Sequence, residues 1–280
     1  MTLTRRQVTE LLSAHGLAPR RARGQNFVVD PNTVRRVARL ARVGPGDRVL
    51  EIGAGLGSLT LALAETGAAV TAVEVDHGIA AVLRSIVEPV GVTVVEGDAL
   101  ELDLAAVLGA GPWVLVANLP YNVATPLVVR VLEEVPAVTR MLVMVQAEVA
   151  DRLAAAPGSP AYGAVSVIVA WWASATVVGQ VPATVFVPRP KVASALVAIE
   201  RRPSPRGDAR FEPPPYARFK AVARAGFGQR RKMLRRSLAG VVEPAAFGAA
   251  GVGPDARAEE LGLDQWARLA AWAPNGPTPS

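Results

Sequence analysis

The chain has 280 residues, 51% of them hydrophobic, which suffices for one large core or two modest ones without disulfide support. It contains no cysteine, which excludes disulfides, thiolate metal sites and cysteine nucleophiles and fits a reducing compartment. Only two histidines, His15 and His77, are present, so neither a histidine metal cluster nor a histidine-based triad is expected. No apolar run approaches the roughly 20 residues that span a bilayer, and residues 1–16 lack the apolar segment of a secretory signal. We expect a cytoplasmic protein without a metal.

The net charge of +6 is unevenly distributed along the chain. Residues 1–42 carry nine Arg against two carboxylates, a net charge of +7, and residues 201–280 carry fourteen basic against seven acidic residues, again +7. Residues 43–200 carry seven basic against fifteen acidic residues, a net charge of −8. Two basic ends around an acidic body indicate a polyanionic partner, most simply nucleic acid. The alternative is an Arg-rich surface that reflects a compositionally biased genome.

The first 42 residues are expected to form two short helices joined by a basic arm. Residues 5–15 have helical spacing, and the polar, Arg-rich stretch 20–27 follows them. Asp30 can cap a second helix that runs to residue 41, and Pro31 suits its first turn.

A glycine-rich turn lies between two predicted elements. A strand at residues 48–52 runs into Gly53-Ala54-Gly55-Leu56-Gly57, a helical run at 58–65 follows, and a second strand at 69–73 ends at Glu74. This is the order of a nucleotide-binding βαβ unit, in which glycines admit the ligand to the backbone and the acid accepts ribose hydroxyl protons. The glycine spacing is neither that of a dinucleotide site nor that of a P-loop, which favours a ligand without pyrophosphate, such as S-adenosylmethionine. A chance match in a glycine-rich chain is the alternative.

Polar residues also follow the next two predicted strands. A third strand at residues 92–95 leads to Gly97-Asp98-Ala99, where Asp98 can accept a hydrogen bond from an adenine amino group or, alternatively, cap a helix. A fourth strand at 113–117 leads to Asn118-Leu119-Pro120-Tyr121. Strand ends are where open α/β sheets bind ligands, although these four residues could equally form a simple turn.

The rest of the chain divides at a proline-rich linker. Before the linker we expect a helix at residues 125–134, a strand at 139–145 and a helix that ends at about residue 155. An apolar run at 165–178 follows, with Trp171 and Trp172 expected in the core. A stiff loop from Phe186 to Lys191 then leads to a strand at 195–199. After the linker we expect helical stretches over 216–238 that break at Gly226-Phe227-Gly228, and a last helix at 263–272. Residues 229–238 are strongly basic and are either a phosphate-binding surface or a solvated helix face.

The residues at 118–121 suit alkylation of an adenine amine, whose lone pair is delocalised into the ring. The Asn118 side-chain oxygen and the Leu119 carbonyl can accept the amine hydrogens, and Pro120 keeps Leu119 out of the α region. Tyr121 offers a flat face to the base and Phe186 a second one, with stacking worth about 1–3 kcal/mol per base. Catalysis would then consist of positioning and electrostatic preorganisation, with no covalent intermediate.

Taken together, these motifs resemble those of the rRNA adenine N6-dimethyltransferases. The resemblance is greatest to the small-subunit (KsgA/RsmA) type in an actinobacterial form, and it extends from about Arg20 to Leu238. The motifs that carry it are Gly24-Gln25-Asn26-Phe27, Glu51-Ile52-Gly53-Ala54-Gly55, Glu74, Gly97-Asp98, Asn118-Leu119-Pro120-Tyr121, Phe186-Val187-Pro188-Arg189-Pro190-Lys191-Val192-Ala193-Ser194 and Gln229-Arg230-Arg231-Lys232. Two departures are conservative: Ala54 stands where the family usually has Pro, and Val28 where it commonly has Leu.

The resemblance implies an α/β fold, a Rossmann-like class I methyltransferase with a seven-stranded mostly parallel sheet, plus a small C-terminal all-α domain. The expected domains are a basic N-terminal arm with helices at residues 1–42, the methyltransferase domain at 43–202, the linker at 203–215 and a helical RNA-binding domain at 216–280.

The resemblance also implies roles for single residues. Donor binding is expected from Gln25, Asn26, Val28, Gly53, Gly55, Glu74, Asp98, Ala99 and Asn118, with Glu74 at the ribose and Asp98 at the adenine. Catalysis is expected from Asn118, Leu119, Pro120, Tyr121 and Phe186. RNA contacts are expected from Arg20, Arg21, Arg23, Arg189, Lys191, Arg230, Arg231, Lys232 and Arg235.

The implied activity is S-adenosylmethionine-dependent dimethylation of two adjacent adenosines near the 3′ end of 16S rRNA, by a monomer acting on a pre-30S particle. One alternative is an Erm-type enzyme that methylates 23S rRNA and confers macrolide resistance. Another is an assembly checkpoint factor in which methylation is secondary. A nicotinamide oxidoreductase ranks third, because the glycine spacing does not match that chemistry.

Overall fold

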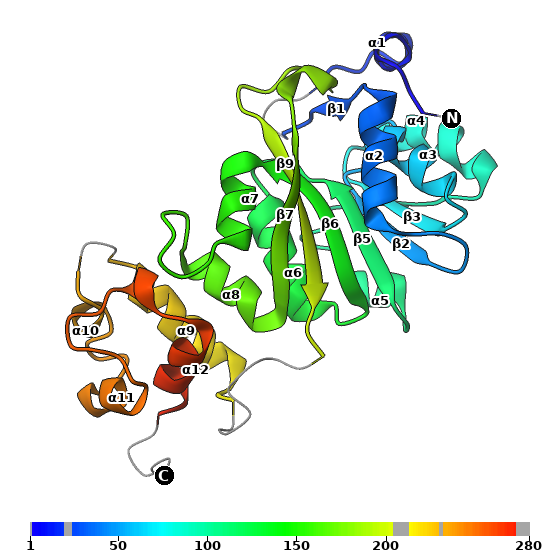
Figure 1. The fold of residues 1–280 in the computed structure, drawn as a ribbon. Helices are drawn as coiled ribbons and strands as arrows, with labels where there is room; N and C mark the ends of the chain where they lie inside the picture. The colour runs from blue at the N-terminus through cyan, green and yellow to red at the C-terminus, as the bar shows by residue number, and fades with distance from the viewer. Residues whose placement is uncertain (1, 20–23, 204–212, 230–231, 273–280) are drawn as a thin grey trace. The chain divides into compact units, whose positions relative to one another are not determined.

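The computed structural model describes residues 2–19, 24–203, 213–229 and 232–272 (Figure 1). The chain forms two compact units, one of Met1–Ala150 with Thr176–Arg201 and the other of Asp151–Ala175 with Arg202–Ser280. The second unit thus takes in residues 151–175 as well as the C-terminal part, so the units are not the consecutive segments expected from chain order.

A seven-stranded sheet with the order β4-β3-β2-β5-β6-β9-β7 organises the first unit. Its strands are β2 (Arg48–Ile52), β3 (Ala69–Glu74), β4 (Thr93–Glu96), β5 (Trp113–Asn118), β6 (Val138–Gln146), β7 (Ala173–Val181) and β9 (Ser194–Arg201). The neighbours from β4 to β6 pair in parallel, and β9 pairs with β6 in the antiparallel sense. The expected mostly parallel sheet is confirmed, and β2 lies between β3 and β5 at the point where strand order reverses.

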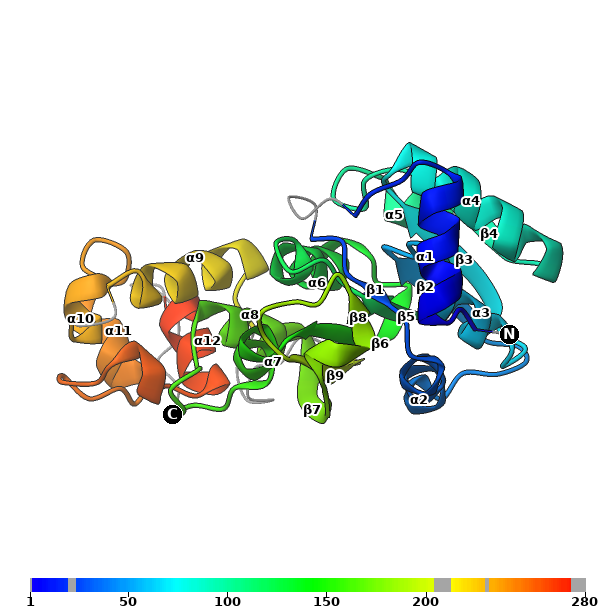
Figure 2. The ribbon, with the colours of Figure 1, turned by 90° about the horizontal axis from the view of Figure 1, so that it is seen from above.

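Helices pack on both faces of this sheet. The helices in this part of the chain are α1 (Arg5–Ala14), α2 (Pro31–Ala41), α3 (Ser58–Ala64), α4 (His77–Val87), α5 (Leu104–Leu108), α6 (Ala124–Glu134) and α7 (Ala147–Ala154), of which α1 lies past the ends of the strands (Figure 1). Figure 2 shows α2 and α6 on opposite faces. As expected, Asp30 caps α2: its carboxylate accepts a hydrogen bond from the Thr33 backbone N–H at 2.9 Å.

A second, two-stranded sheet joins segments far apart in sequence. Strand β1 (Phe27–Val28) pairs antiparallel with β8 (Phe186–Val187), so that Val28 lies opposite Phe186. The Val29 N–H donates to the Val185 carbonyl at 2.8 Å and extends this pairing by one residue. The arm that follows α1 is thereby held against the loop that precedes β9.

The second unit is helical, with a core that includes Trp171, Phe219 and Trp266. Its helices are α8 (Ala164–Trp172), α9 (Tyr216–Phe227), α10 (Leu234–Ser237), α11 (Pro244–Ala249) and α12 (Leu263–Ala271). The predicted break at Gly226-Phe227-Gly228 is confirmed, because α9 ends at Phe227 with Gly228 as its C-cap and α10 begins only at Leu234. A Cβ at Gly226 would clash with the Trp266 ring, so this glycine also serves close helix packing.

Candidate active site

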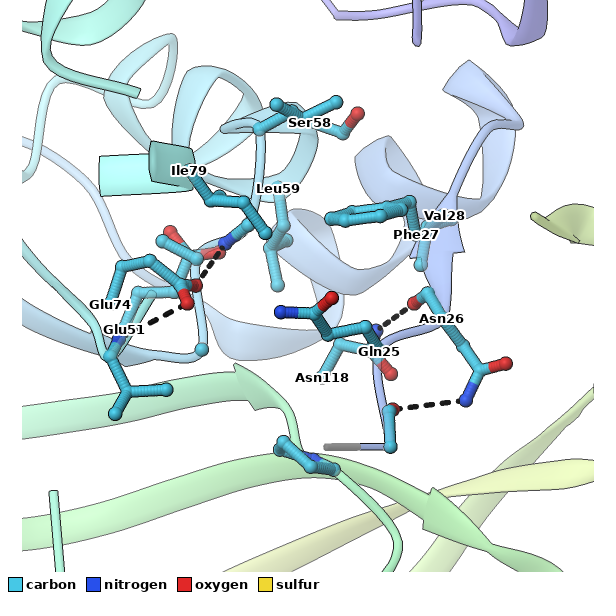
Figure 3. A pocket seen from close by; sticks show the side chains of 17 residues that line it. Gln25, Asn26, Phe27, Val28, Glu51, Ser58, Leu59, Glu74, Ile79 and Asn118 are labelled. Atoms are coloured by element: carbon cyan, nitrogen blue, oxygen red, sulfur yellow. Dashed lines mark hydrogen bonds between the residues drawn. The ribbon is translucent and has the colours of Figure 1, made fainter. Parts of the chain in front are cut away.

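A pocket opens at the carboxyl ends of β2, β3 and β5 in the first unit (Figure 3). Glu51 and Glu74 lie on one side of it, and Gln25, Asn26 and Val28 of the arm lie on the other. The pocket is therefore formed by strand ends on one side and by residues 24–28 on the other.

The glycine-rich turn between β2 and α3 forms one wall of the pocket. Gly53 and Gly55 have φ angles of 73° and 59°, a left-handed conformation that side chains disfavour. A Cβ at Gly55 would come within 3.0 Å of the Phe27 ring, so only glycine lets the arm pack this closely on the turn. The two glycines leave backbone exposed to a ligand in the pocket.

Glu74 is fixed at the end of β3 by three backbone hydrogen bonds. Its Oε2 accepts from the Gly55 N–H at 2.8 Å, and its Oε1 accepts from the Val75 and Asp76 N–H groups at 3.1 and 3.0 Å. Burial nevertheless raises the pKa of this carboxyl above its ordinary value. The remaining lone pairs of a rigidly held carboxylate suit recognition of two adjacent hydroxyl groups.

Glu51 lines the same pocket and was not singled out for a role from the sequence. Its side chain is 2% exposed, and among the described residues its Oε2 has no hydrogen-bond partner. Burial raises its pKa from 4.5 to about 8, and the negative charge of Glu74 adds to the effect. A signal for Glu51 is present in the sequence, because a carboxylate stands next to the end of the otherwise mostly apolar strand β2.

Glu51 therefore makes a pH-dependent contribution to stability. Because its folded pKa lies above the unfolded value, the folded state holds a proton that the unfolded state releases, and stability falls as pH rises from about 4.5 to 8. We expect Glu51→Gln to unfold at higher urea concentration than the unmodified protein at pH 8, with a gain on the order of 3 kcal/mol that disappears near pH 5. Urea titrations at pH 5, 6.5 and 8 measure this difference.

Glu96 provides the control for that titration. It is exposed, and its pKa is lowered by its hydrogen bonds to His77 and Arg84, so Glu96→Gln should give no gain at pH 8. A Glu51→Gln variant with the same pH dependence as the unmodified protein would contradict the assignment of a buried, protonated Glu51.

Asn118 connects the arm to the residues that follow β5. Its Nδ2 donates to the Asn26 carbonyl at 3.0 Å. Since a carbonyl only accepts, the NH₂ group must face Asn26, which fixes the orientation of the amide and directs Oδ1 elsewhere. The sequence predicted Oδ1 as an acceptor for an amine, and the geometry is compatible with that role.

The residues after Asn118 are held by separate contacts. The Leu119 N–H donates to the Met144 carbonyl at 3.0 Å, and the Leu119 side chain is buried. Pro120 lines the pocket, and its carbonyl accepts from the Val123 and Ala124 N–H groups. Tyr121 is half-buried, and its hydroxyl lies 2.9 Å from the Ser194 hydroxyl.

The structure gathers most, but not all, of the predicted site residues at this pocket. The pocket is lined by Gln25, Asn26, Val28, Gly53, Gly55, Glu74, Asn118 and Pro120. Asp98, Ala99, Leu119, Tyr121 and Phe186 lie outside its lining. Sequence reasoning missed Glu51, Ser58, Val75 and Ile79, which also line it.

Asp98 and Ala99 lie beside the pocket, just after β4. The Gly97 N–H donates to the Glu74 carbonyl at 3.0 Å, which joins this turn to the end of β3. Asp98 is exposed and its Oδ1 accepts from the Leu100 N–H at 2.8 Å within a turn, whereas the next helix, α5, begins at Leu104 and is capped by Asp103. Arg130 of α6 donates to the Ala99 and Leu102 carbonyls at 2.6 and 3.0 Å and so holds the turn.

Phe186 does not have the free face expected of a stacking residue. It is 0% exposed, in strand β8, and belongs to the hydrophobic core of the first unit. Pairing with β1 turns its side chain inward, which the proline-rich sequence around it did not indicate. Stacking by Phe186 would require this strand to move.

The predicted RNA-contacting residues are exposed where the structure describes them. Arg189, Lys191, Lys232 and Arg235 are exposed, and Arg235 lies 4.0 Å from Asp255. Arg20, Arg21, Arg23, Arg230 and Arg231 lie outside the described residues. Within the described part of the chain, no helix is long and apolar enough to cross a membrane, and no three His, Cys, Asp or Glu are grouped to hold a metal ion.

The pocket fits S-adenosylmethionine in several respects. The glycine turn admits a ligand to the backbone, Glu74 can take the ribose hydroxyls, and Val75 and Ile79 supply apolar surface for a purine. Glu51 is protonated at neutral pH, and a cationic ligand beside its buried Oε2 would favour the charged form of this carboxyl. These residues together suit a nucleoside that carries positive charge.

Comparisons with known proteins agree with this geometry. A family model described as "Ribosomal RNA adenine dimethylase" matches residues 17–274. Two relatives are named "Ribosomal RNA small subunit methyltransferase A". The protein from Kineococcus radiotolerans is 48% identical over 98% of this chain and 92% of its own length. The protein from Streptomyces coelicolor is 46% identical over 94% of this chain and 94% of its own length.

Two solved structures share the fold. The 23S rRNA methyltransferase ErmE has a TM-score of 0.67 at 27% identity, covering 87% of this chain and 98% of its own. A dimethyladenosine transferase from Plasmodium falciparum has a TM-score of 0.70 at 21% identity, covering 87% and 95%, and is similar in fold.

Proposed function

The chain belongs to the ribosomal RNA adenine dimethylase family, and from this we propose that it dimethylates the N6 amines of two adjacent adenosines near the 3′ end of small-subunit rRNA. It is a methyltransferase with S-adenosylmethionine as its methyl donor. The names of its relatives, which are small-subunit methyltransferases, support the choice of substrate.

The orientation of the Asn118 amide is the main structural observation that supports this proposal. Because the Asn26 carbonyl holds its NH₂ group, its oxygen is available to accept a hydrogen from the target amine. The amide lies at the pocket proposed for the donor, so the amine and the methyl group would meet beside it. A binding protein without catalysis would not require an acceptor fixed at this point.

The chain's own residues orient the reactants. S-adenosylmethionine supplies a methyl group already activated by its sulfonium. Glu74 and the glycine turn hold the donor, while Asn118 and the Leu119 carbonyl accept the hydrogens of the amine and free its lone pair. Tyr121 stacks on the base. Each transfer forms one N–C bond, breaks one S–C bond and releases one amine proton to solvent.

Exposed cations would bring the rRNA to this site. Arg189 and Lys191 precede β9 in the first unit, and Lys232 and Arg235 belong to the second. Such side chains neutralise phosphates without reading sequence, so a folded pre-30S particle would select the adenosines. We propose that a monomer acts on this particle in the cytoplasm, without a metal.

Mass spectrometry of methylated rRNA tests the proposal. Purified protein and labelled S-adenosylmethionine are incubated with small subunits from a strain that lacks this modification, and the rRNA is digested and mapped. We expect four methyl groups on two neighbouring adenosines near the 3′ end of 16S rRNA. Large subunits are the control, and a single labelled adenosine in 23S rRNA would favour the Erm-type alternative, which the fold of ErmE also fits.

A further inference from the structure

Ser194 has a buried hydroxyl that contacts the proposed acceptor site. It is the first residue of β9, pairs with Gln146 of β6, and is 0% exposed. A buried hydroxyl without a partner is costly, and this one lies 2.9 Å from the hydroxyl of Tyr121. The Ser194 side chain therefore reaches the residue proposed to stack on the target base.

The contact joins two segments that are 73 residues apart. Tyr121 lies in the turn between β5 and α6, and its backbone is anchored nearby by the bond from the Leu119 N–H to the Met144 carbonyl. The tyrosine ring is thus held at its backbone end by β6 and at its hydroxyl end by β9. With both ends fixed, the half-buried ring has one orientation in which to present its face.

We propose that Ser194 is a positioning residue for methyl transfer, which holds the Tyr121 ring at the angle where the target adenine stacks. This rests on the proposed function, because the ring must have a base to receive. Transfer in line with the sulfonium is sensitive to small misplacement of the amine, so a freely tilting ring would slow the chemical step. Donor binding would be unaffected, because neither Ser194 nor Tyr121 lines the pocket proposed for the donor.

The hydroxyl pair acts by geometry and not by proton transfer. Burial raises the pKa of Tyr121, so the phenol stays protonated at neutral pH. Losing one neutral hydrogen bond should slow the single-turnover rate about fivefold, which corresponds to about 1 kcal/mol. Removing the whole ring by Tyr121→Ala should cost on the order of tenfold more than Tyr121→Phe, because the stacking face is lost as well.

A double-mutant cycle tests the proposal. Single-turnover methylation of unmodified small subunits is measured at saturating donor for the unmodified protein, Ser194→Ala, Tyr121→Phe and the double variant. If Ser194 acts through the Tyr121 hydroxyl, each single variant is about fivefold slower and the double variant is no slower than either. The donor dissociation constant, measured by calorimetry, should stay within twofold in all four proteins.

Ser166→Ala is the matched control. Ser166 is also a buried serine, at 2% exposure, and its hydroxyl donates to the Arg152 carbonyl at 2.6 Å in the second unit. This variant controls for the loss of a buried serine hydroxyl as such, and its transfer rate should lie within twofold of that of the unmodified protein.

The outcomes separate this proposal from the proposed function. If the two fivefold effects multiply, so that the double variant is about 25-fold slower than the unmodified protein, Ser194 acts by packing β9 and not through Tyr121. If the transfer rate of Ser194→Ala is unchanged, Ser194 has no role in the reaction. Either result overturns the positioning role while methylation by the unmodified protein still stands. A protein that methylates no small-subunit adenosine refutes the proposed function and the positioning role together.

Discussion

Replacing Asn118 with alanine is expected to lower the single-turnover rate of methyl transfer on the order of 1,000-fold while the dissociation constant for S-adenosylmethionine stays within tenfold. The amide oxygen is the proposed acceptor for the target amine, and alanine offers no replacement. The donor retains the glycine turn and Glu74, so its binding changes only through the lost bond to the Asn26 carbonyl. Rapid-quench methylation and calorimetry measure the two quantities separately.

Two further variants define what Asn118 contributes. Asn118→Asp keeps an acceptor but cannot donate to the Asn26 carbonyl, and its charge repels that oxygen, so donor affinity should fall further than in Asn118→Ala. Asn32→Ala, at an exposed position of α2, is the matched control and should behave like the unmodified protein. Turnover retained in Asn118→Ala would remove the acceptor role.

The second large effect is expected at Glu74. Glu74→Ala removes the proposed ribose contact and leaves the N–H groups of Gly55, Val75 and Asp76 without their acceptor. We expect donor binding to weaken about 100-fold, equivalent to about 3 kcal/mol, with the transfer rate at saturating donor within tenfold of normal. Calorimetry on protein that passes a thermal unfolding check measures the loss.

Glu96→Gln is the control for Glu74→Ala. Glu96 lies opposite Glu74 in the register of β3 and β4, but it is exposed and faces His77 and Arg84. Its substitution should leave the donor dissociation constant within twofold. If Glu74→Ala bound the donor as tightly as Glu96→Gln does, the ribose would have to be held by another residue.

The sheet and much of the pocket could be predicted because their signals are local. Three strands can each be predicted from a short apolar run and the residue that follows or ends it. They are the strand before Gly53, the strand that ends at Glu74 and the strand that ends at Asn118. Parallel strands put such ends at one edge of the sheet, so these residues could be grouped from the sequence alone.

Long-range packing accounts for what the sequence did not reveal. Strands β1 and β8 have two residues each, too short for any periodic signal, and their pairing decides that Phe186 is buried. Gly226 is recognisable from the sequence only as part of a helix break, and the fold shows that it also leaves room for the ring of Trp266, forty residues later. The sequence places Glu51 within a mostly apolar strand, and only the fold shows that its carboxyl lines the pocket.

The bond between Asn118 and Asn26 has a thermodynamic consequence. Asn26 lines the pocket and its carbonyl holds the Asn118 amide, so a donor that contacts Asn26 also acts on the residue proposed to meet the acceptor. Linkage then requires reciprocity: the factor by which donor tightens rRNA binding equals the factor by which rRNA tightens donor binding. Four successive transfers need three exchanges of spent donor for fresh donor. At each exchange the spent donor would leave against the cooperativity that the bound rRNA maintains, so tighter coupling would favour retention of the substrate at the expense of turnover.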